Sequence, residues 1–134
     1  MNSDDLLAQA IKTRTAAYAP YSRFAVGAAL ETRSGRVFTG CNVENLSFGL
    51  TCCAERNAIF AAVAAGERDF VRIVIVADSR EPVTPCGACR QVMAEFSDEL
   101  EVRSVNLQGV EYMANLRELL PRAKAGILDQ LRST

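Results

Sequence analysis

The spacing of apolar side chains changes from helical to extended along the first part of the chain. Apolar residues recur at helical spacing from Ser3 to Tyr18, which predicts an amphipathic helix. The run from Phe24 to Glu31 is apolar and partly β-branched, and after a turn at 33–35 the chain returns through 36–39. This second pattern is typical of a β-hairpin.

A loop and a second helix follow the hairpin. From Cys41 to Thr51, polar and apolar residues alternate until Gly49 breaks the pattern, as in a functional loop. The stretch from Cys53 to Ala65 is rich in alanine, and Gly66 follows it as a C′ residue. We therefore expect a helix whose small side chains let it lie close to a sheet.

The second half of the chain alternates strands and helices. Phe70 to Ala77 is aliphatic apart from Arg72, which predicts a central strand buried on both faces. The other predicted elements are a helix over Cys86–Phe96, strands over Glu101–Leu107 and Val110–Met113, a short helix capped by Asn115 and ended by Pro121, and a last short helix over Ile127–Leu131. This order indicates a layered α/β architecture. A length of 134 residues suits one domain over residues 1–134.

The charge balance excludes some partners. The sequence has 15 basic and 16 acidic residues and a net charge of -1, and no stretch gathers lysine and arginine into a patch that could follow a phosphate backbone. We therefore expect no nucleic-acid partner. No apolar stretch approaches the roughly 20 residues that cross a bilayer, so we expect no membrane partner.

Histidine is absent, and this restricts the chemistry. Ser-His-Asp and Cys-His nucleophiles are excluded, and a transition-metal site must use thiolate or carboxylate ligands. Five cysteines are available. Their odd number, one Cys-x-x-Cys spacing and an N-terminus without signal-peptide features favour a reduced, cytoplasmic protein over a disulfide framework.

Two cysteine motifs fall at the starts of predicted helices. Cys-Ala-Glu-Arg occupies 53–56 and Pro-Cys-Gly-Ala-Cys occupies 85–89. Unpaired N–H groups and the helix dipole stabilise thiolates at such positions. The sulfurs of Cys53, Cys86 and Cys89 can therefore bind one zinc ion and leave its fourth position open, as in catalytic zinc sites.

Two side chains beside the first cysteine complete this hypothesis. Glu55 is placed to handle protons of a metal-bound water. Three thiolates on a divalent cation leave a net negative charge, and Arg56 can offset it by donating hydrogen bonds to the ligand sulfurs.

Other interpretations of the cysteines remain open from the spacing alone. Cys86 and Cys89 could form a redox pair, but that leaves Cys53 and Glu55 unexplained. Cys52 could add a fourth thiolate and close a structural zinc site, although adjacent ligands on one metal are awkward. We expect Cys52 and Cys41 to be buried small side chains instead.

The motifs resemble those of the zinc nucleoside and nucleobase deaminases, which share a ligand-x-Glu followed by Pro-Cys-x-x-Cys. With cysteine as the first ligand, the sequence resembles the short, homotetrameric type of cytidine deaminase. Matching segments cover nearly the whole chain: YAPYSRF at 18–24, VGAAL at 26–30, GCNVEN at 40–45, CGACRQV at 86–92 and ELLP at 118–121. The resemblance implies a three-layer α/β/α fold around a mixed sheet of about five strands. It also implies one Zn²⁺ per subunit and a homotetramer with pockets shared between subunits.

The same resemblance implies an activity and site residues. Cytidine and deoxycytidine are hydrolysed to uridine and deoxyuridine, and ammonia is released. Glu55 takes a proton from the attacking water, passes it to N3 and helps the amino group leave. Phe24 packs against the nucleoside, Asn42 and Glu44 hydrogen-bond the ribose hydroxyls, and backbone groups around Ala54 and residues 85–86 hold the base.

Three positions depart from the family pattern. Lys124 stands where an aromatic residue usually reaches a neighbouring pocket. Leu46 and Phe48 replace a frequent Ala and Tyr in a loop whose residues can cross between subunits. These changes admit a related aminopyrimidine nucleoside, such as blasticidin S or a modified cytidine, as the substrate. An alternative from another class is a non-catalytic, zinc-stabilised binding domain, which predicts that replacing Glu55 leaves function intact.

Overall fold

A five-stranded mixed sheet forms the middle layer of the protein. The computed structural model describes residues 3–124. The strands, in spatial order, are β2 (Val37–Cys41), β1 (Val26–Thr32), β3 (Phe70–Ala77), β4 (Glu101–Asn106) and β5 (Glu111–Asn115). The pair β3–β4 is parallel and the other pairs are antiparallel. The predicted mixed sheet and its central strand are confirmed.

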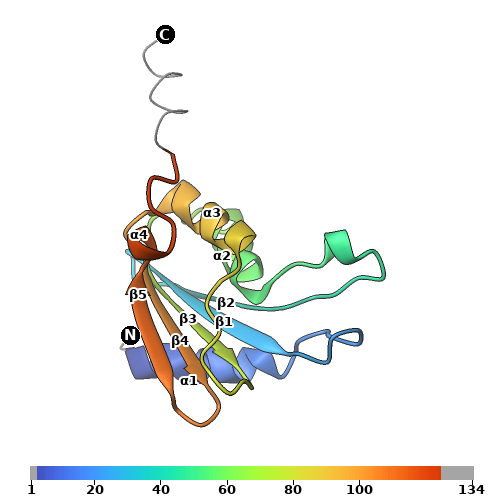
Figure 1. The fold of residues 1–134 in the computed structure, drawn as a ribbon. Helices are drawn as coiled ribbons and strands as arrows, with labels where there is room; N and C mark the ends of the chain where they lie inside the picture. Colours follow the sequence, from blue (N-terminus) through green and yellow to red (C-terminus); the bar gives the residue numbers. More distant parts are fainter. Residues whose placement is uncertain (1–2, 125–134) are drawn as a thin grey trace.

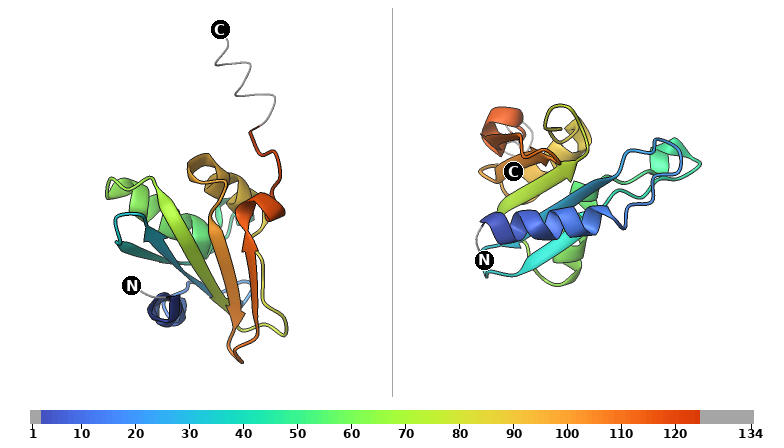
Figure 2. Two further views of the ribbon diagram at one scale, coloured as in Figure 1. Left: turned by 90° about the vertical axis from the view of Figure 1, so that its left-hand side faces the viewer. Right: turned by 90° about the horizontal axis from the view of Figure 1, so that it is seen from below.

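Helices cover both faces of the sheet (Figures 1 and 2). Helix α1 (Ser3–Arg14) lies on one face, and α2 (Ala54–Ala64), α3 (Gly87–Phe96) and the short α4 (Leu116–Leu119) lie on the other. This arrangement is the expected three-layer α/β/α fold.

Alternating residues of β3 supply both hydrophobic cores. Ile73 and Ile75 belong to the core beneath α2 and α3, whereas Val74 and Val76 belong to the core beneath α1. Successive side chains of a strand point to opposite faces, so an almost wholly aliphatic strand is what a sheet covered on both sides requires.

Glycine allows a helix to lie directly on the sheet at Gly40. A Cβ atom there would lie 2.4 Å from the carbonyl oxygen of Ala54 and 2.5 Å from the amide nitrogen of Ala58. Both atoms belong to the backbone of α2. The position of the N-terminal half of α2 therefore depends on the missing side chain in β2.

The first helix is shorter than predicted. It ends at Arg14 rather than Tyr18. Tyr18 instead pairs with Val43, because its amide nitrogen donates to the carbonyl oxygen of Asn42 and its own oxygen accepts from Glu44. Because this partner is distant in sequence, the spacing of apolar residues near Tyr18 does not predict the pairing. The predicted helix over Ile127–Leu131 lies outside the described residues.

Candidate active site

The N-termini of α2 and α3 bring three sulfur atoms together. Cys53 is the N-cap residue of α2 and Cys86 that of α3, and Cys89 lies in the first turn of α3. The Cys53 and Cys86 Sγ atoms are 3.9 Å apart, those of Cys86 and Cys89 are 3.5 Å apart, and all three lie within 4.8 Å of one another. Two sulfurs on one tetrahedral zinc, each about 2.3 Å from the metal, would be about 3.8 Å apart. The three sulfurs therefore fit a zinc ion.

The electrostatics of the cluster favour a thiolate at Cys53. A hydrogen bond from the Cys89 thiol and the neighbouring Arg56 guanidinium lower the pKa of Cys53 to about 5 against the effect of burial. The same hydrogen bond raises the pKa of Cys89, because its proton is held toward Cys53. One anionic sulfur is thus available to a metal cation, and binding of that cation would require the remaining thiols to lose their protons.

Glu55 lies beside this cluster, in the first turn of α2. It is buried, with 6% of its surface exposed. Burial raises the pKa of its carboxyl group to about 7, and a hydrogen bond with the Cys89 thiol opposes that rise. The residue is thus a carboxylic acid that can both accept and donate a proton near neutral pH.

Arg56 contacts the first sulfur from outside the cluster. Its Nη2 atom lies 3.4 Å from Cys53 Sγ, at hydrogen-bonding distance for sulfur. This contact with the Cys53 sulfur raises the pKa of the guanidinium group above its ordinary value, so the arginine stays cationic beside the ligand.

Asn42 and Phe24 are joined through the backbone. The buried Asn42 amide donates from Nδ2 to the carbonyl oxygen of Phe24 at 2.8 Å and accepts at Oδ1 from the amide of Val26, also at 2.8 Å. Phe24 is 37% exposed and is therefore not a core residue. Asn42 fixes the segment that presents this ring.

Glu44 is held by the turn before Phe24. Its Oε1 atom accepts from the amide nitrogens of Tyr21 at 2.9 Å and Ser22 at 3.1 Å, and its Oε2 atom accepts from the Ser22 hydroxyl. The Ser22 hydroxyl is the main cause of the lowered pKa of Glu44. Since Val43 pairs with Cys52, the segment 42–44 lies next to the residue that precedes the Cys53 ligand.

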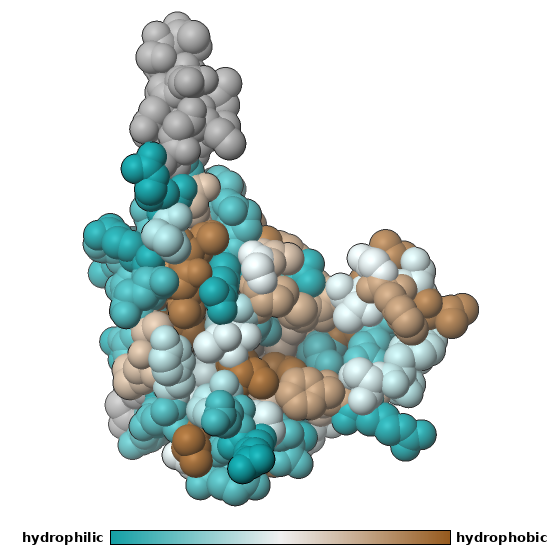
Figure 3. Space-filling model, in the orientation of Figure 1, coloured by the Kyte–Doolittle hydropathy of each residue, from teal (hydrophilic) through white to brown (hydrophobic). Residues whose placement is uncertain are grey.

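Leu46 and Phe48 belong to the loop between β2 and α2. This loop projects from the body of the protein (Figures 1 and 3). Leu46, Phe48 and Leu50 are 78%, 73% and 70% exposed. The Phe48 ring packs edge-on against Tyr21, with ring centroids 5.8 Å apart. A hollow of about 390 Å³ lies between this loop and the turn at Tyr21 and Ser22, and Glu44 is among the residues that line it.

The described structure does not place Cys52 with the other sulfurs. Its amide and carbonyl groups both pair with Val43, and the sulfurs that gather belong to Cys53, Cys86 and Cys89. The alternative of a closed four-thiolate site is therefore unsupported. Cys41 and Cys52 are partly exposed rather than buried, so the expectation of full burial was wrong.

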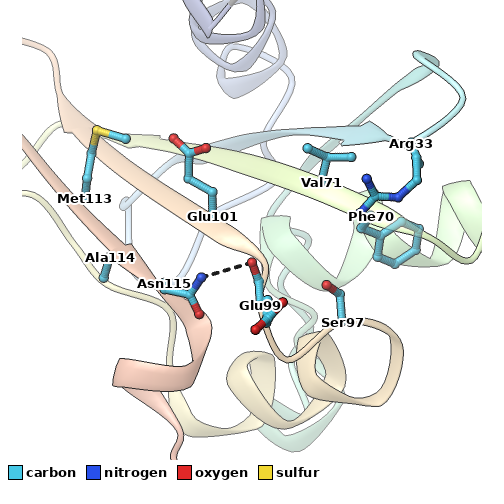
Figure 4. A pocket seen from close by; sticks show the side chains of 9 residues that line it. All are labelled: Arg33, Phe70, Val71, Ser97, Glu99, Glu101, Met113, Ala114 and Asn115. Carbon is cyan, nitrogen blue, oxygen red and sulfur yellow. Dashed lines mark hydrogen bonds between the residues drawn. The ribbon is translucent and has the colours of Figure 1, made fainter.

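A second hollow lies at the far end of the sheet, where β3 and β4 begin (Figure 4). Its volume is about 490 Å³, and Phe70, Glu101 and Asn115 are among the lining residues. The Asn115 side chain donates to the carbonyl oxygen of Glu99 at 3.1 Å. None of the predicted site residues lines this hollow, so it is not the candidate active site.

Sequence reasoning overlooked two residues that organise the site. Ser22 binds Glu44, and Arg90 binds the loop before Cys86. Both fall inside segments that match the deaminase family, but nothing in their spacing predicts their partners.

Comparison with known proteins agrees with this geometry. The family model described as "Cytidine and deoxycytidylate deaminase zinc-binding region" matches residues 1–103. The chain belongs to this family. A family defined by zinc binding and a three-sulfur cluster together give one zinc ion per subunit.

Individual relatives are similar over most of the chain. A cytidine deaminase of Halalkalibacterium halodurans is 52% identical over 124 residues, which cover 92% of this chain and 94% of the relative. The crystal structure of cytidine deaminase from Burkholderia pseudomallei superposes with a TM-score of 0.88 at 51% identity, covering 90% of this chain and 98% of that one. A blasticidin-S deaminase of Bacillus cereus is 32% identical over 104 residues, which cover 72% of this chain and 74% of the relative.

No helix between residues 3 and 124 combines the length and apolar character that a membrane crossing requires.

Proposed function

We propose that this protein is a zinc-dependent hydrolase that converts cytidine and deoxycytidine to uridine and deoxyuridine with release of ammonia. The observation that carries the proposal is a buried carboxyl group, Glu55, hydrogen-bonded to Cys89, one of three sulfurs that gather at the N-termini of two helices. The high identity to named cytidine deaminases supports the choice of substrate.

Cys53, Cys86 and Cys89 would hold the zinc ion. When bound, the ion supplies Lewis acidity and an activated water at neutral pH. Three thiolates carry more negative charge than a divalent cation neutralises, and the positive charge of Arg56 would offset the excess. Its hydrogen bond to Cys53 draws electron density from that sulfur and keeps the site electrophilic.

Glu55 carries the protons of the reaction. Its carboxylate accepts a proton from the attacking water, delivers it to N3 of the pyrimidine and then assists departure of the amino group from C4. Burial suits this cycle, because it keeps bulk water from competing for the proton and leaves the acid and base forms close in free energy.

Asn42, Glu44 and Phe24 would bind the nucleoside. The Glu44 carboxylate retains a free lone pair for a ribose hydroxyl, and Asn42 retains one N–H group after its two backbone contacts. Phe24 offers an exposed apolar ring, and backbone groups around Ala54 would hold the base.

The protein would act as a homotetramer, with Leu46 and Phe48 reaching the pocket of a neighbouring subunit. Large apolar side chains on a projecting loop are expected to be covered by a partner, and the exposure of these two residues supports that role. We further propose that residues 1–134 form a single catalytic domain and that the protein works in the cytoplasm, where its thiols stay reduced.

An ultraviolet assay of purified protein with known zinc content tests the proposal. Cytidine and deoxycytidine should be turned over faster than blasticidin S. Glu55→Gln should lower kcat about 10²–10⁴-fold, the usual contribution of a general acid-base, whereas Glu95→Gln, at an exposed position on α3, should match the wild type. Faster turnover of blasticidin S would reassign the substrate. Absence of turnover by the zinc-loaded wild type would instead support the binding-domain alternative, and full activity of Glu55→Gln would remove Glu55 from the mechanism.

A further inference from the structure

The loop between β3 and α3 delivers the most exposed of the three sulfur ligands. Residues 78–85 form this loop, and Cys86 follows as the N-cap of α3. Cys89 is completely buried and Cys53 is partly buried, but Cys86 is exposed. Packing therefore holds the Cys86 side chain less than the other two, and its position depends more on how the preceding backbone is held.

Among the described residues, hydrogen bonds from outside this loop reach it through two side chains. Asn106 on β4 donates to the carbonyl oxygen of Arg80 at 3.1 Å, near the start of the loop. Arg90 on α3 holds its end. Arg90 Nε donates to the carbonyl oxygen of Pro85 at 2.7 Å, and Nη2 donates to Thr84 Oγ1 at 3.1 Å.

Arg90 also reaches the neighbouring helix α4. Its Nη1 atom donates to the carbonyl oxygen of Leu119 at 2.9 Å, the last residue of α4. Helix ends leave carbonyl groups without intrahelical partners, and a guanidinium group is a suitable donor for them. One planar side chain thus ties α4, which lies beside α3 (Figure 1), to the loop that carries the zinc ligand.

We infer that Arg90 is a positioning residue for the zinc ligand Cys86. The carbonyl group of Pro85 belongs to the peptide bond that enters Cys86, so fixing that oxygen fixes the direction in which the Cys86 side chain leaves the backbone. The anchor at Leu119 holds the guanidinium plane in place. Only an arginine offers enough donors in a rigid fork to satisfy three acceptors at once.

The rate of zinc loss from the purified holoenzyme to a chromophoric chelator measures this role directly. Arg90→Gln should release zinc about 10–100-fold faster than the wild type, the effect usually seen when a group that orients a metal ligand is lost. Arg90→Lys should fall between the two, because one ammonium group cannot span all three acceptors. Thr84→Val removes a single contact, and it should give a smaller acceleration of zinc loss even if Arg90→Gln fails to fold.

Two controls separate positioning from general stability. Arg117→Ala removes an arginine from α4 whose ion pair with Glu99 is exposed, and it should release zinc at the wild-type rate. Ile59→Val weakens the core beneath α2. Compared with an Arg90 or Thr84 variant that loses the same amount of Tm, it should release zinc at the wild-type rate.

Zinc loss at the wild-type rate from folded Arg90→Gln or Thr84→Val would overturn the inference. Equal acceleration by Ile59→Val would overturn it as well, because stability alone would then explain the effect. The readout does not require turnover, so a failure to deaminate cytidine would count against the proposed function and leave this test intact.

Discussion

Replacing Gly40 with alanine should displace the helix that carries Glu55. The new Cβ atom would lie 2.4 Å from the Ala54 carbonyl oxygen, and 3.4 Å is the lower end of ordinary contact, so α2 must retreat by about 1 Å. Overpacking of this kind costs about 1–3 kcal/mol, which should lower Tm by about 4–11 °C in a protein of this size.

The same displacement should damage catalysis more than stability. Ala54 and Glu55 lie in the first turn of α2, directly after Cys53, so a shift of α2 moves the carboxyl group relative to the sulfurs of α3. A misplacement of about 1 Å can reduce turnover about 100-fold. Steady-state kinetics of cytidine deamination at a temperature below the Tm of the variant would measure this loss.

Gly35→Ala provides a matched control for the Gly40 variant. Gly35 has a φ of +91°, and no atom of the described residues lies within 4 Å of the point where its Cβ would stand, so alanine there strains the turn between β1 and β2 without touching α2. Its Tm should fall by an amount set by strain of about 1–2 kcal/mol, and its kcat should be unchanged. Wild-type Tm and turnover in Gly40→Ala, or an equal loss of turnover in Gly35→Ala, would refute the reasoning.

Two further predictions concern groups that support the site. Arg56→Gln loses a charge-assisted hydrogen bond to Cys53, worth about 1.5–3 kcal/mol, so kcat should fall about 10–100-fold in zinc-loaded protein; unchanged kcat would remove Arg56 from the mechanism. Ser22→Ala should raise the pKa of Glu44, because the Ser22 hydroxyl is the main cause of its low value. A carboxylate that binds ribose is lost as pH falls through its pKa, so KM for cytidine should begin to rise at a higher pH in this variant. Ser22→Thr keeps the hydroxyl and should follow the wild-type profile; superimposed profiles for all three proteins would contradict the assignment.

The architecture could be predicted from sequence because its main signals are local. The aliphatic run of β3, the alanine-rich pattern of α2 with Gly66 behind it, and the capping box formed by Asn115 and Glu118 each depend on neighbouring residues. The end of α1 was missed because it depends on Tyr18 pairing with Val43, which only the folded chain brings together.

Some residues of the site could likewise be predicted from local sequence, and others could not. Cysteines at the starts of two helices, with Glu55 in the following turn, are visible in the sequence as motifs. The engagement of Glu44 by Ser22, 22 residues away, and of Leu119 by Arg90, 29 residues away, depends on tertiary packing. The type and spacing of residues predict the groups that do the chemistry, but they do not predict which side chains hold those groups in place.

The pairing of Val43 with Cys52 closes the projecting loop at its base, one peptide bond before the Cys53 ligand. Residues at the tip, such as Leu46 and Phe48, can therefore change identity, and the tip can lengthen, while the strain of that change stops at the closed base. Changes at the tip of the loop can thus leave the position of the Cys53 ligand unaltered.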